Sequence, residues 1–324
     1  MLNNGKTTLW FQKHSTAALL AVLLLLIGSS AFAAEYFLSP SGDDANPGTE
    51  ARPFQTLERA RDAVRNNPDK GREPITVWLK EGRYFRNQTF VLNKLDSGTE
   101  QAPVTYKALK KETVFIDGGR VIHPKEVEPV NDASILDRLR SEVRSKVVQI
   151  DLRKLGITDY GSIGLRGFRR TYRPAPLEVF INGKPLQLAR WPNKGKKMLP
   201  LGEVLDKGNV PAAGDNVIRG AKFKYITPRA RRWVEAENMY VAGFFNKGWA
   251  DDILPVAEID TGKGTIKTAR SHRYGFVKRP YTKWYALNLI EELDQPSEYF
   301  LERDIRLLYL YPPERLSNPL IQVS

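Results

Sequence analysis

The chain has 324 residues, of which 41% are hydrophobic and none is cysteine, and its formal net charge is +13. The lack of cysteine excludes disulfide bonds, thiolate chemistry and a lipid-modified cysteine, so stability must come from a hydrophobic core, which a chain of this length can build. The positive charge favours anionic partners such as uronate-rich polysaccharides, nucleic acid or anionic lipid, although a basic protein without such a partner fits it equally well. No segment interleaves basic and aromatic residues as a nucleic-acid-binding module would, so we expect no nucleic-acid partner.

Residues 1–33 have the three parts of a secretory signal peptide. Lys6 and Lys13 precede an unbroken apolar run from Ala17 to Ile27, and Ala31-Phe-Ala33 ends in an A-x-A cleavage pattern. The run is shorter than the about 20 apolar residues that span a bilayer as a helix. We therefore expect cleavage after Ala33 and export to the periplasm or the extracellular medium, with no membrane contact afterwards. An uncleaved anchor is the alternative. Cleavage would remove two lysines and no acidic residue, which lowers the net charge from +13 by two, to +11.

Residues 34–120 are expected to form an N-terminal cap and the first coils of a β-structure. An amphipathic helix is predicted after Thr56, which can cap it, and Asn66-Asn67-Pro68 ends the helix. No helical segment of 10–15 residues separates the β-rich runs that follow, which excludes a doubly wound α/β sheet and favours a sandwich, a barrel or a β-solenoid. The helix favours the solenoid, because a first coil needs a capping element. The β-rich runs are Ile75–Leu79, Thr89–Leu92, Val104–Tyr106 and Thr113–Ile116.

Residues 121–287 break this rhythm and are predicted to form a β-rich inserted subdomain. Asn182-Gly183, a dipeptide typical of type I′ turns, predicts a hairpin between Leu177–Ile181 and Lys184–Ala189. Residues 288–324 are predicted to return to the β-helix, with Leu307–Tyr311 as the strongest strand.

Segments in order along the whole mature chain carry a family resemblance. Tyr36-Phe-Leu-Ser-Pro-Ser-Gly-Asp-Asp-Ala-Asn-Pro-Gly48, Pro53-Phe-Gln-Thr-Leu57 and Val77–Tyr84 resemble the opening of the right-handed parallel β-helix carbohydrate-active enzymes, which have the pectin-lyase-like fold. Later segments are similar to one subgroup of these enzymes, which has a β-rich insertion near the N-terminus and whose members are often named glycoside hydrolases. Those segments are Leu188–Asn193, Gly248–Asp252, Asn288–Pro296 and Leu308–Pro313.

The resemblance implies an all-β fold, with a right-handed parallel β-helix start, an N-terminal capping helix and the inserted subdomain. It also implies a glycoside hydrolase that acts on a polysaccharide or an oligosaccharide. Two turns depart from the family pattern: Pro296-Ser297-Glu298-Tyr299 replaces Pro-Gly-Glu-Trp, and Glu302–Arg306 replaces an Asp-Arg followed by a Thr-Gly turn. Proteins of this type continue for several hundred residues past the Tyr-Pro-Pro segment. We therefore expect a truncated or split copy that lacks most catalytic coils and could be inactive.

Glycoside hydrolysis needs two carboxyl groups, about 5–5.5 Å apart for retention or 6.5–9.5 Å apart for inversion. Asp251 and Asp252 are weak catalytic candidates beside Trp249, which could bind a sugar. In a strand these two aspartates would point to opposite faces, so both could not serve one site. A polar turn around a packed tryptophan is the alternative.

Glu291 and Glu292 are the other weak catalytic candidates, because with Asp294 they match the family's Glu-Glu-Leu-Asp motif. A structural role, in which they hold the insertion to the first coils, is the alternative. Arg190 and Trp191 are candidates for substrate binding, although an arginine after a hairpin strand is as often a salt-bridge partner.

A polysaccharide lyase acting on a uronate-rich glycan is the second enzyme class, because it uses a basic residue and often an acidic calcium site. Asp43-Asp44 is too short a signal for that site. No cofactor and no metal site are otherwise expected, since His123 and His272 should be ordinary histidines. A non-catalytic glycan-binding surface protein is the third hypothesis.

Overall fold

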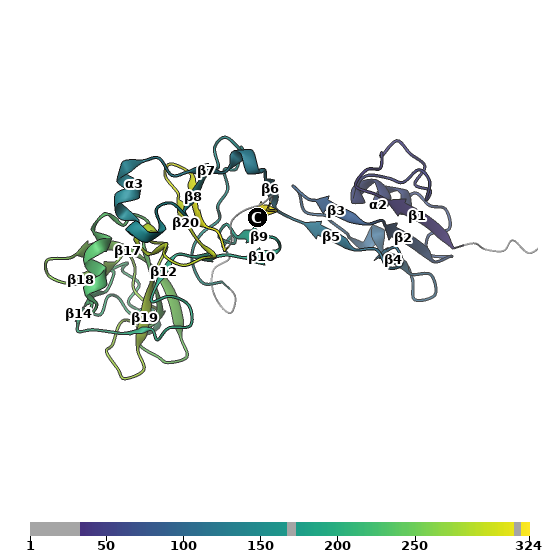
Figure 1. The fold of residues 1–324 in the computed structure, drawn as a ribbon. Coiled ribbons are helices and arrows are strands. Elements are labelled where there is room, and N and C mark those ends of the chain that lie inside the picture. Colours follow the sequence, from purple (N-terminus) through teal and green to yellow (C-terminus); the bar gives the residue numbers. More distant parts are fainter. Residues whose placement is uncertain (1–32, 167–172, 314–318) are drawn as a thin grey trace, which may run out of the picture. The chain divides into compact units, whose positions relative to one another are not determined.

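The computed structural model describes residues 33–166, 173–313 and 319–324. The predicted signal peptide falls on residues 1–33, almost all of which lie outside this description. None of the described helices is long and apolar enough to cross a membrane. The described chain is mostly β, which confirms the all-β class, and it divides into two compact units, Met1–Gly118 and Gly119–Ser324 (Figure 1).

The first unit contains two parallel sheets. In the three-stranded sheet, β1 (Ala34–Leu38), β2 (Ile75–Leu79) and β4 (Val104–Ala108) lie side by side in register. In the two-stranded sheet, β3 (Gly82–Phe85) pairs with β5 (Val114–Asp117). The chain therefore follows the same two-strand path twice, first through β2 and β3 and then through β4 and β5, as successive solenoid coils do.

The predicted helix is confirmed as α2 (Leu57–Arg65). The Thr56 hydroxyl accepts a hydrogen bond from the backbone N–H of Arg59 at 3.1 Å, a cap that contributes about 1 kcal/mol. Its apolar residues pack into one core with residues of β1 and β2: Leu57, Ala60, Val64, Leu38, Ile75 and Val77.

The predicted strand at Thr89–Leu92 is wrong. The segment belongs to no sheet, and about half of the Val91 and Leu92 surfaces is exposed (53% and 50%). β-branched and aromatic residues form a strand only where they can pair and pack against a neighbouring strand. Among the described strands, none pairs with this segment. A short 3-10 helix, η1 (Lys94–Asp96), follows it.

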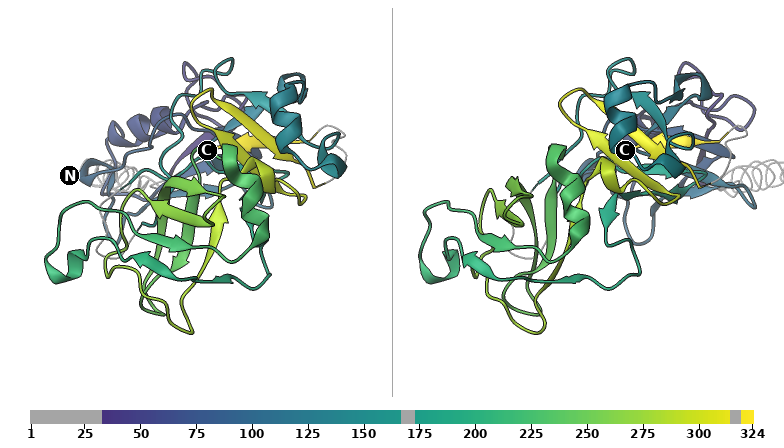
Figure 2. Two further views of the ribbon diagram at one scale, coloured as in Figure 1. Left: turned by 90° about the vertical axis from the view of Figure 1, so that its left-hand side faces the viewer. Right: turned by 60° about the vertical axis from the view of Figure 1, so that its left-hand side comes forward.

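The second unit contains three sheets with mostly antiparallel pairing (Figure 2). Asn182 and Gly183 both have positive φ angles, 52° and 75°, which confirms the type I′ hairpin between β9 and β10. The four-stranded sheet has the order β10 (Lys184–Pro185), β9 (Val179–Ile181), β22 (Ile321–Val323), β6 (Arg120–Ile122). The five-stranded sheet has the order β11 (Gln187–Leu188), β20 (Glu298–Glu302), β21 (Leu307–Tyr311), β8 (Val148–Asp151), β7 (Glu128–Pro129).

The third sheet has eight strands and forms its own core, which includes Trp233 and Trp284. Its order is β12 (Arg190–Trp191), β19 (Lys283–Leu287), β16 (Tyr240–Phe244), β17 (Asp251–Asp260), β18 (Thr265–Thr268), β15 (Lys222–Lys224), β14 (Val204–Asp206), and β13 (Leu199–Pro200) also pairs with β19. The short helices of this unit are α3 (Ala133–Arg138), η2 (Pro124–Glu126), η3 (Ser141–Val143), η4 (Pro211–Ala213), η5 (Pro228–Glu235) and η6 (Ile290–Glu292).

The described strands of the C-terminal segment, β20, β21 and β22, pair with strands of the second unit. β20 and β21 pair antiparallel in the five-stranded sheet, and β22 lies between β9 and β6. β20 and β21 pair antiparallel because the turn 303–306 that joins them has four residues, whereas parallel strands need a crossover of a dozen residues or more. Figure 1 shows the yellow C-terminal strands beside the teal β8 and β9. The boundary between the two units, at Gly118 and Gly119, lies close to the predicted boundary between 34–120 and 121–287, and the separation of 288–324 stays a prediction.

Candidate functional site

Glu291 and Glu292, the carboxylates of the Glu-Glu-Leu-Asp motif, lie in η6 and are buried. The Nε atom of Arg229 donates to Glu292 Oε2 at 2.8 Å, and Trp233 Nε1 donates to Glu292 Oε1 at 2.7 Å. Arg138 Nε donates to Glu291 Oε1 at 2.8 Å. Burial raises the pKa of Glu292, against the opposing effects of Arg229 and Trp233. These contacts join η6 to η5 and α3 within the second unit, which supports a structural role.

Arg190 and Trp191, the candidates for substrate binding, lie next to this network in β12. The Arg190 guanidinium lies 3.5 Å from the centre of the Tyr285 ring, and its Nε donates to the carbonyl of Pro192 at 2.9 Å. Burial lowers the pKa of Arg190. The Arg229 guanidinium lies 4.1 Å from the centre of the Trp191 ring. Arg190 and Trp191 are thus held by neighbours, with polar and ring contacts that a substrate would have to displace.

Glu298, in the altered Pro-Ser-Glu-Tyr turn, is completely buried at the start of β20. Its carboxylate accepts hydrogen bonds from the backbone N–H groups of Asp294 and Gln295 at 3.2 and 3.1 Å, and from Gln187 Nε2 at 3.1 Å. Burial nevertheless raises its pKa to about 8.

The pKa of Glu298 predicts a pH-dependent stability. Because its pKa in the folded state lies above the ordinary 4.5, the stability from its bound proton is complete below that pH and is lost as the pH rises towards about 8. We expect the free energy of unfolding of the wild type to fall by a few kcal/mol between pH 5 and 8, since a difference of one pKa unit corresponds to about 1.4 kcal/mol. The Glu298→Gln variant, which has no proton to lose there, should show a smaller fall. Urea unfolding at both pH values measures it. An equal loss in the variant would contradict the prediction.

Asp251 and Asp252, the other catalytic candidates, lie in β17 and point to opposite faces, as the spacing predicted. Asp251 is exposed, whereas Asp252 is buried and forms a two-pronged ion pair with Arg270. Nη1 of Arg270 lies 3.0 Å from Asp252 Oδ2, and Nη2 lies 3.2 Å from Oδ1. The Nη2 atom also donates to the carbonyl of Ile253 at 2.9 Å. Asp252 and Arg270 thus form a fixed, mutually neutralised pair.

This pair lines a pocket of about 280 Å³, which we call the Asp252 pocket. Its lining is mainly polar, and Asp252 is the one acidic residue in it. Because hydrolysis needs two carboxyl groups, these residues suit the binding of a polar ligand better than cleavage of a glycosidic bond. The lining residues are Asn209, Pro211, Asn216, Ile218, Asp252, Arg270, Ser271 and Arg273.

Trp249 precedes Asp252 of the pocket lining by three residues, and its ring contacts that of Tyr274. It is 72% exposed, so the alternative of a packed tryptophan is wrong, and its ring meets that of Tyr274 edge to face at 5.6 Å between centres. Tyr274 directly follows Arg273 of the pocket lining. An exposed aromatic side chain with an apolar face beside polar groups is suited to a sugar ring.

The remaining acidic and histidine candidates have structural surroundings. His272 is buried against Phe245, and its Nδ1 accepts a hydrogen bond from the backbone N–H of Tyr274 at 3.3 Å. Asp44 accepts the backbone N–H groups of Gln55 and Thr56, both at 2.9 Å, and so orders the turn before α2. His123 is exposed before η2.

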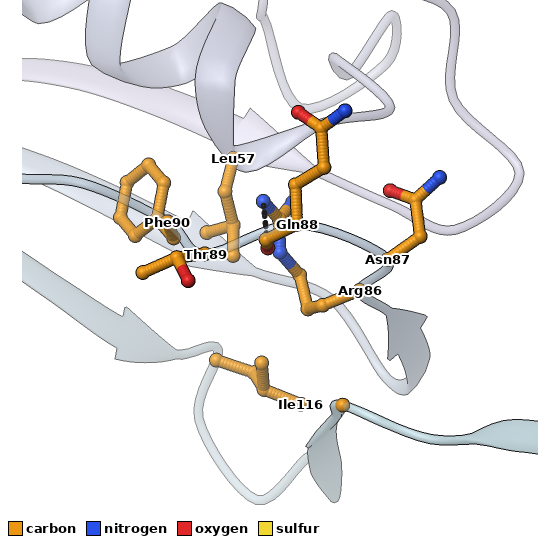
Figure 3. A pocket seen from close by; sticks show the side chains of 8 residues that line it. Leu57, Arg86, Asn87, Gln88, Thr89, Phe90 and Ile116 are labelled. Atoms are coloured by element: carbon orange, nitrogen blue, oxygen red, sulfur yellow. Dashed lines mark hydrogen bonds between the residues drawn. The ribbon is translucent and has the colours of Figure 1, made fainter. Parts of the chain in front are cut away.

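A second pocket, of about 440 Å³, lies in the first unit (Figure 3). Arg86 donates there to the carbonyl of Gln88 at 3.3 Å and forms an ion pair with Glu58. Among the described residues, its lining combines apolar side chains with amides, the Arg86 guanidinium and the Thr89 hydroxyl, and it contains no carboxylate or histidine. The lining residues are Leu57, Arg86, Asn87, Gln88, Thr89, Phe90, Ile116 and Gly118.

Sequence reasoning missed most residues of the Asp252 pocket. Arg270, Ser271 and Arg273 follow β18, and Asn209 and Asn216 flank η4. Nothing in the local sequence brings these segments together. The one available signal was the basic run from Arg270 to Arg273.

No protein-family model matches the chain. Two curated proteins resemble parts of it: the uncharacterized protein YwoF of Bacillus subtilis, 32% identical over 94 residues, and a pectate lyase of Emericella nidulans, 33% identical over 86 residues. These stretches make up 29% and 26% of this chain, and 18% and 19% of the relatives. The chain thus spans less than a fifth of the length of these relatives in the matched stretches.

Solved structures also resemble the chain. A glycoside hydrolase matches 90% of this chain and 46% of its own length, with a TM-score of 0.64 and 20% sequence identity. A rhamnogalacturonan lyase matches 26% of this chain and 21% of its own length, with a TM-score of 0.20 and 25% identity. The first likeness shows a shared fold over most of the chain.

Proposed function

We propose that this chain belongs to an exported, polysaccharide-acting protein with a right-handed parallel β-helix, and that the Asp252 pocket and Trp249 bind the glycan. The observation that carries the proposal is an exposed tryptophan whose ring contacts Tyr274, the residue that follows Arg273 of the polar Asp252 pocket. The fold shared with a glycoside hydrolase and the sequence similarity to a pectate lyase support the carbohydrate class.

We assign binding rather than bond cleavage to the Asp252 pocket. Asp252 is engaged by Arg270, and the pocket lining holds no second carboxylate for a hydrolase mechanism. Glu291 and Glu292 are buried in ion pairs and contribute no open site. Hydrolysis, the reaction of our leading hypothesis, would therefore use groups outside this pocket.

A uronate-rich glycan is the second candidate ligand class, in line with the lyase hypothesis. Arg273 is exposed in the pocket lining, and none of the described residues forms an ion pair with it. A guanidinium can hold a carboxylate with two parallel hydrogen bonds. The net charge, +13 for the full chain and +11 after the expected signal cleavage, would also draw an anionic polymer towards the protein.

Affinity electrophoresis through gels that contain a neutral xylan, a β-glucan or polygalacturonate tests the binding proposal. We expect one or more of these polymers to retard the chain, and retardation by polygalacturonate alone would identify the uronate class. Migration unchanged in every gel would contradict the proposal. Parallel assays for reducing sugar and for the ultraviolet absorbance of an unsaturated product would distinguish a hydrolase and a lyase from a binding protein.

A further inference from the structure

Three carboxylates from two distant segments meet at the turn between β20 and β21. Glu302 ends β20, Asp304 lies in the turn itself, and Glu237 lies between η5 and β16. One carboxylate oxygen from each lies within 4.8 Å of the other two. Asn238 Nδ2 donates to Asp304 Oδ2 at 3.3 Å and helps to hold that carboxylate in place. We call this group the Glu302 cluster.

No lysine, arginine or histidine among the described residues forms an ion pair within 4.0 Å with the Glu302 cluster. Arg138 acts on Glu302 from a distance, but its Nε is already bound to Glu291 at 2.8 Å. Carboxylates this close repel one another, and a bound cation would relieve that repulsion.

Glu302 provides a second, independent indication of a ligand. It is 7% exposed, and its Oε1 has no hydrogen-bond partner among the described residues. A buried oxygen without a hydrogen-bond partner lowers the stability of the fold by about 1–3 kcal/mol, and by more when it is charged. Native structures therefore rarely leave such an oxygen unpaired. Burial raises the pKa of Glu302, and the nearby Glu237 and Asp304 add to this effect while Arg138 opposes it.

We infer that Glu237, Glu302 and Asp304 bind a calcium ion. All three ligands are oxygens, which hard cations prefer. Because one oxygen of each carboxylate lies within 4.8 Å of the other two, all three can contact one Ca²⁺ ion, whose ligands lie at about 2.3–2.6 Å. Ca²⁺ also accepts irregular coordination, whereas Mg²⁺ demands a nearly ideal octahedron. The ion would tie the β20–β21 turn to the segment before β16. This site is separate from the Asp252 pocket and does not depend on glycan binding.

Calorimetric titration of the full chain, first treated with a chelator, with CaCl₂ tests the inference. We expect one site per chain, with a dissociation constant of about 10⁻⁴–10⁻³ M as in extracellular modules, and weaker binding of MgCl₂. With 10 mM CaCl₂, the midpoint of thermal unfolding should rise by roughly 3 °C or more. Glu237→Gln and Asp304→Asn should each reduce both effects. Both residues are exposed, so these variants should still fold.

Asp215→Asn is the matched control, because it removes one exposed carboxylate elsewhere in the second unit. It should keep the calcium response of the wild type. No heat of binding and no thermal shift in the wild type would overturn the inference, as would a full calcium response in both cluster variants. If the wild type does not bind calcium and the Glu302→Gln variant is more stable than the wild type without calcium, a proton on Glu302 and not a cation neutralises the cluster.

Discussion

Replacing Arg229 by methionine is expected to lower the free energy of unfolding by about 3–5 kcal/mol. Arg229 donates to Glu292 through Nε at 2.8 and 3.0 Å, and its Nη2 also reaches Asp294. Glu292 is 0% exposed, so the variant would leave a buried carboxylate with Trp233 as its remaining side-chain partner. Urea unfolding followed by tryptophan fluorescence measures the change.

Arg153→Met provides the control for Arg229→Met. Arg153 pairs with Asp151 at 2.9 Å, but its side chain is 55% exposed, and exposed pairs contribute about 1 kcal/mol or less. We expect this variant to unfold close to the wild-type midpoint. Equal effects of the two substitutions would contradict the view that the buried network stabilises the second unit.

Replacing Trp249 by alanine is expected to weaken glycan binding about 10-fold, because exposed aromatic anchors at binding sites contribute about 1–2 kcal/mol when truncated. Trp249 is 72% exposed and makes one aromatic contact, with Tyr274, so the fold should tolerate the change. The retardation of each protein in affinity gels, measured as a function of polymer concentration, gives its dissociation constant and so the loss of affinity. The thermal midpoint should stay near that of the wild type.

Phe85→Ala is the control for Trp249→Ala. Phe85 is an exposed aromatic residue, at 49%, belongs to the first unit and is not among the residues that line the Asp252 pocket. Its removal should leave glycan binding unchanged. If Trp249→Ala binds as the wild type does, or if Phe85→Ala loses as much affinity, the Asp252 pocket is not the binding site.

Local features of the fold were predictable, because neighbouring residues decide them. The α2 helix follows from the spacing of Leu57, Ala60 and Val64 after a capping threonine, and the β9–β10 hairpin follows from Asn182-Gly183, since few other residues accept two positive φ angles. The strand predicted at Thr89–Leu92 failed, because a β-rich run becomes a strand only when another strand lies beside it.

The candidate site was predictable only in part. Trp249 and Asp252 stood out because an aromatic residue next to carboxylates is visible in the sequence. Arg270, which neutralises Asp252, lies 18 residues further along and reaches it through the β17–β18 pairing. The family motif at Glu291 and Glu292 was visible too, but its burial under Arg138 and Arg229 depends on helices far away in sequence.

The sequence by itself determined the all-β class, the amphipathic helix, the type I′ hairpin and the opposite orientation of Asp251 and Asp252, because these depend on side-chain periodicity and turn chemistry within a few residues. The tertiary structure decided which strands pair and which charges meet. It placed β20, β21 and β22 in sheets of the second unit and brought Glu237 next to Glu302 and Asp304. Such contacts depend on long-range packing, which composition and spacing do not encode.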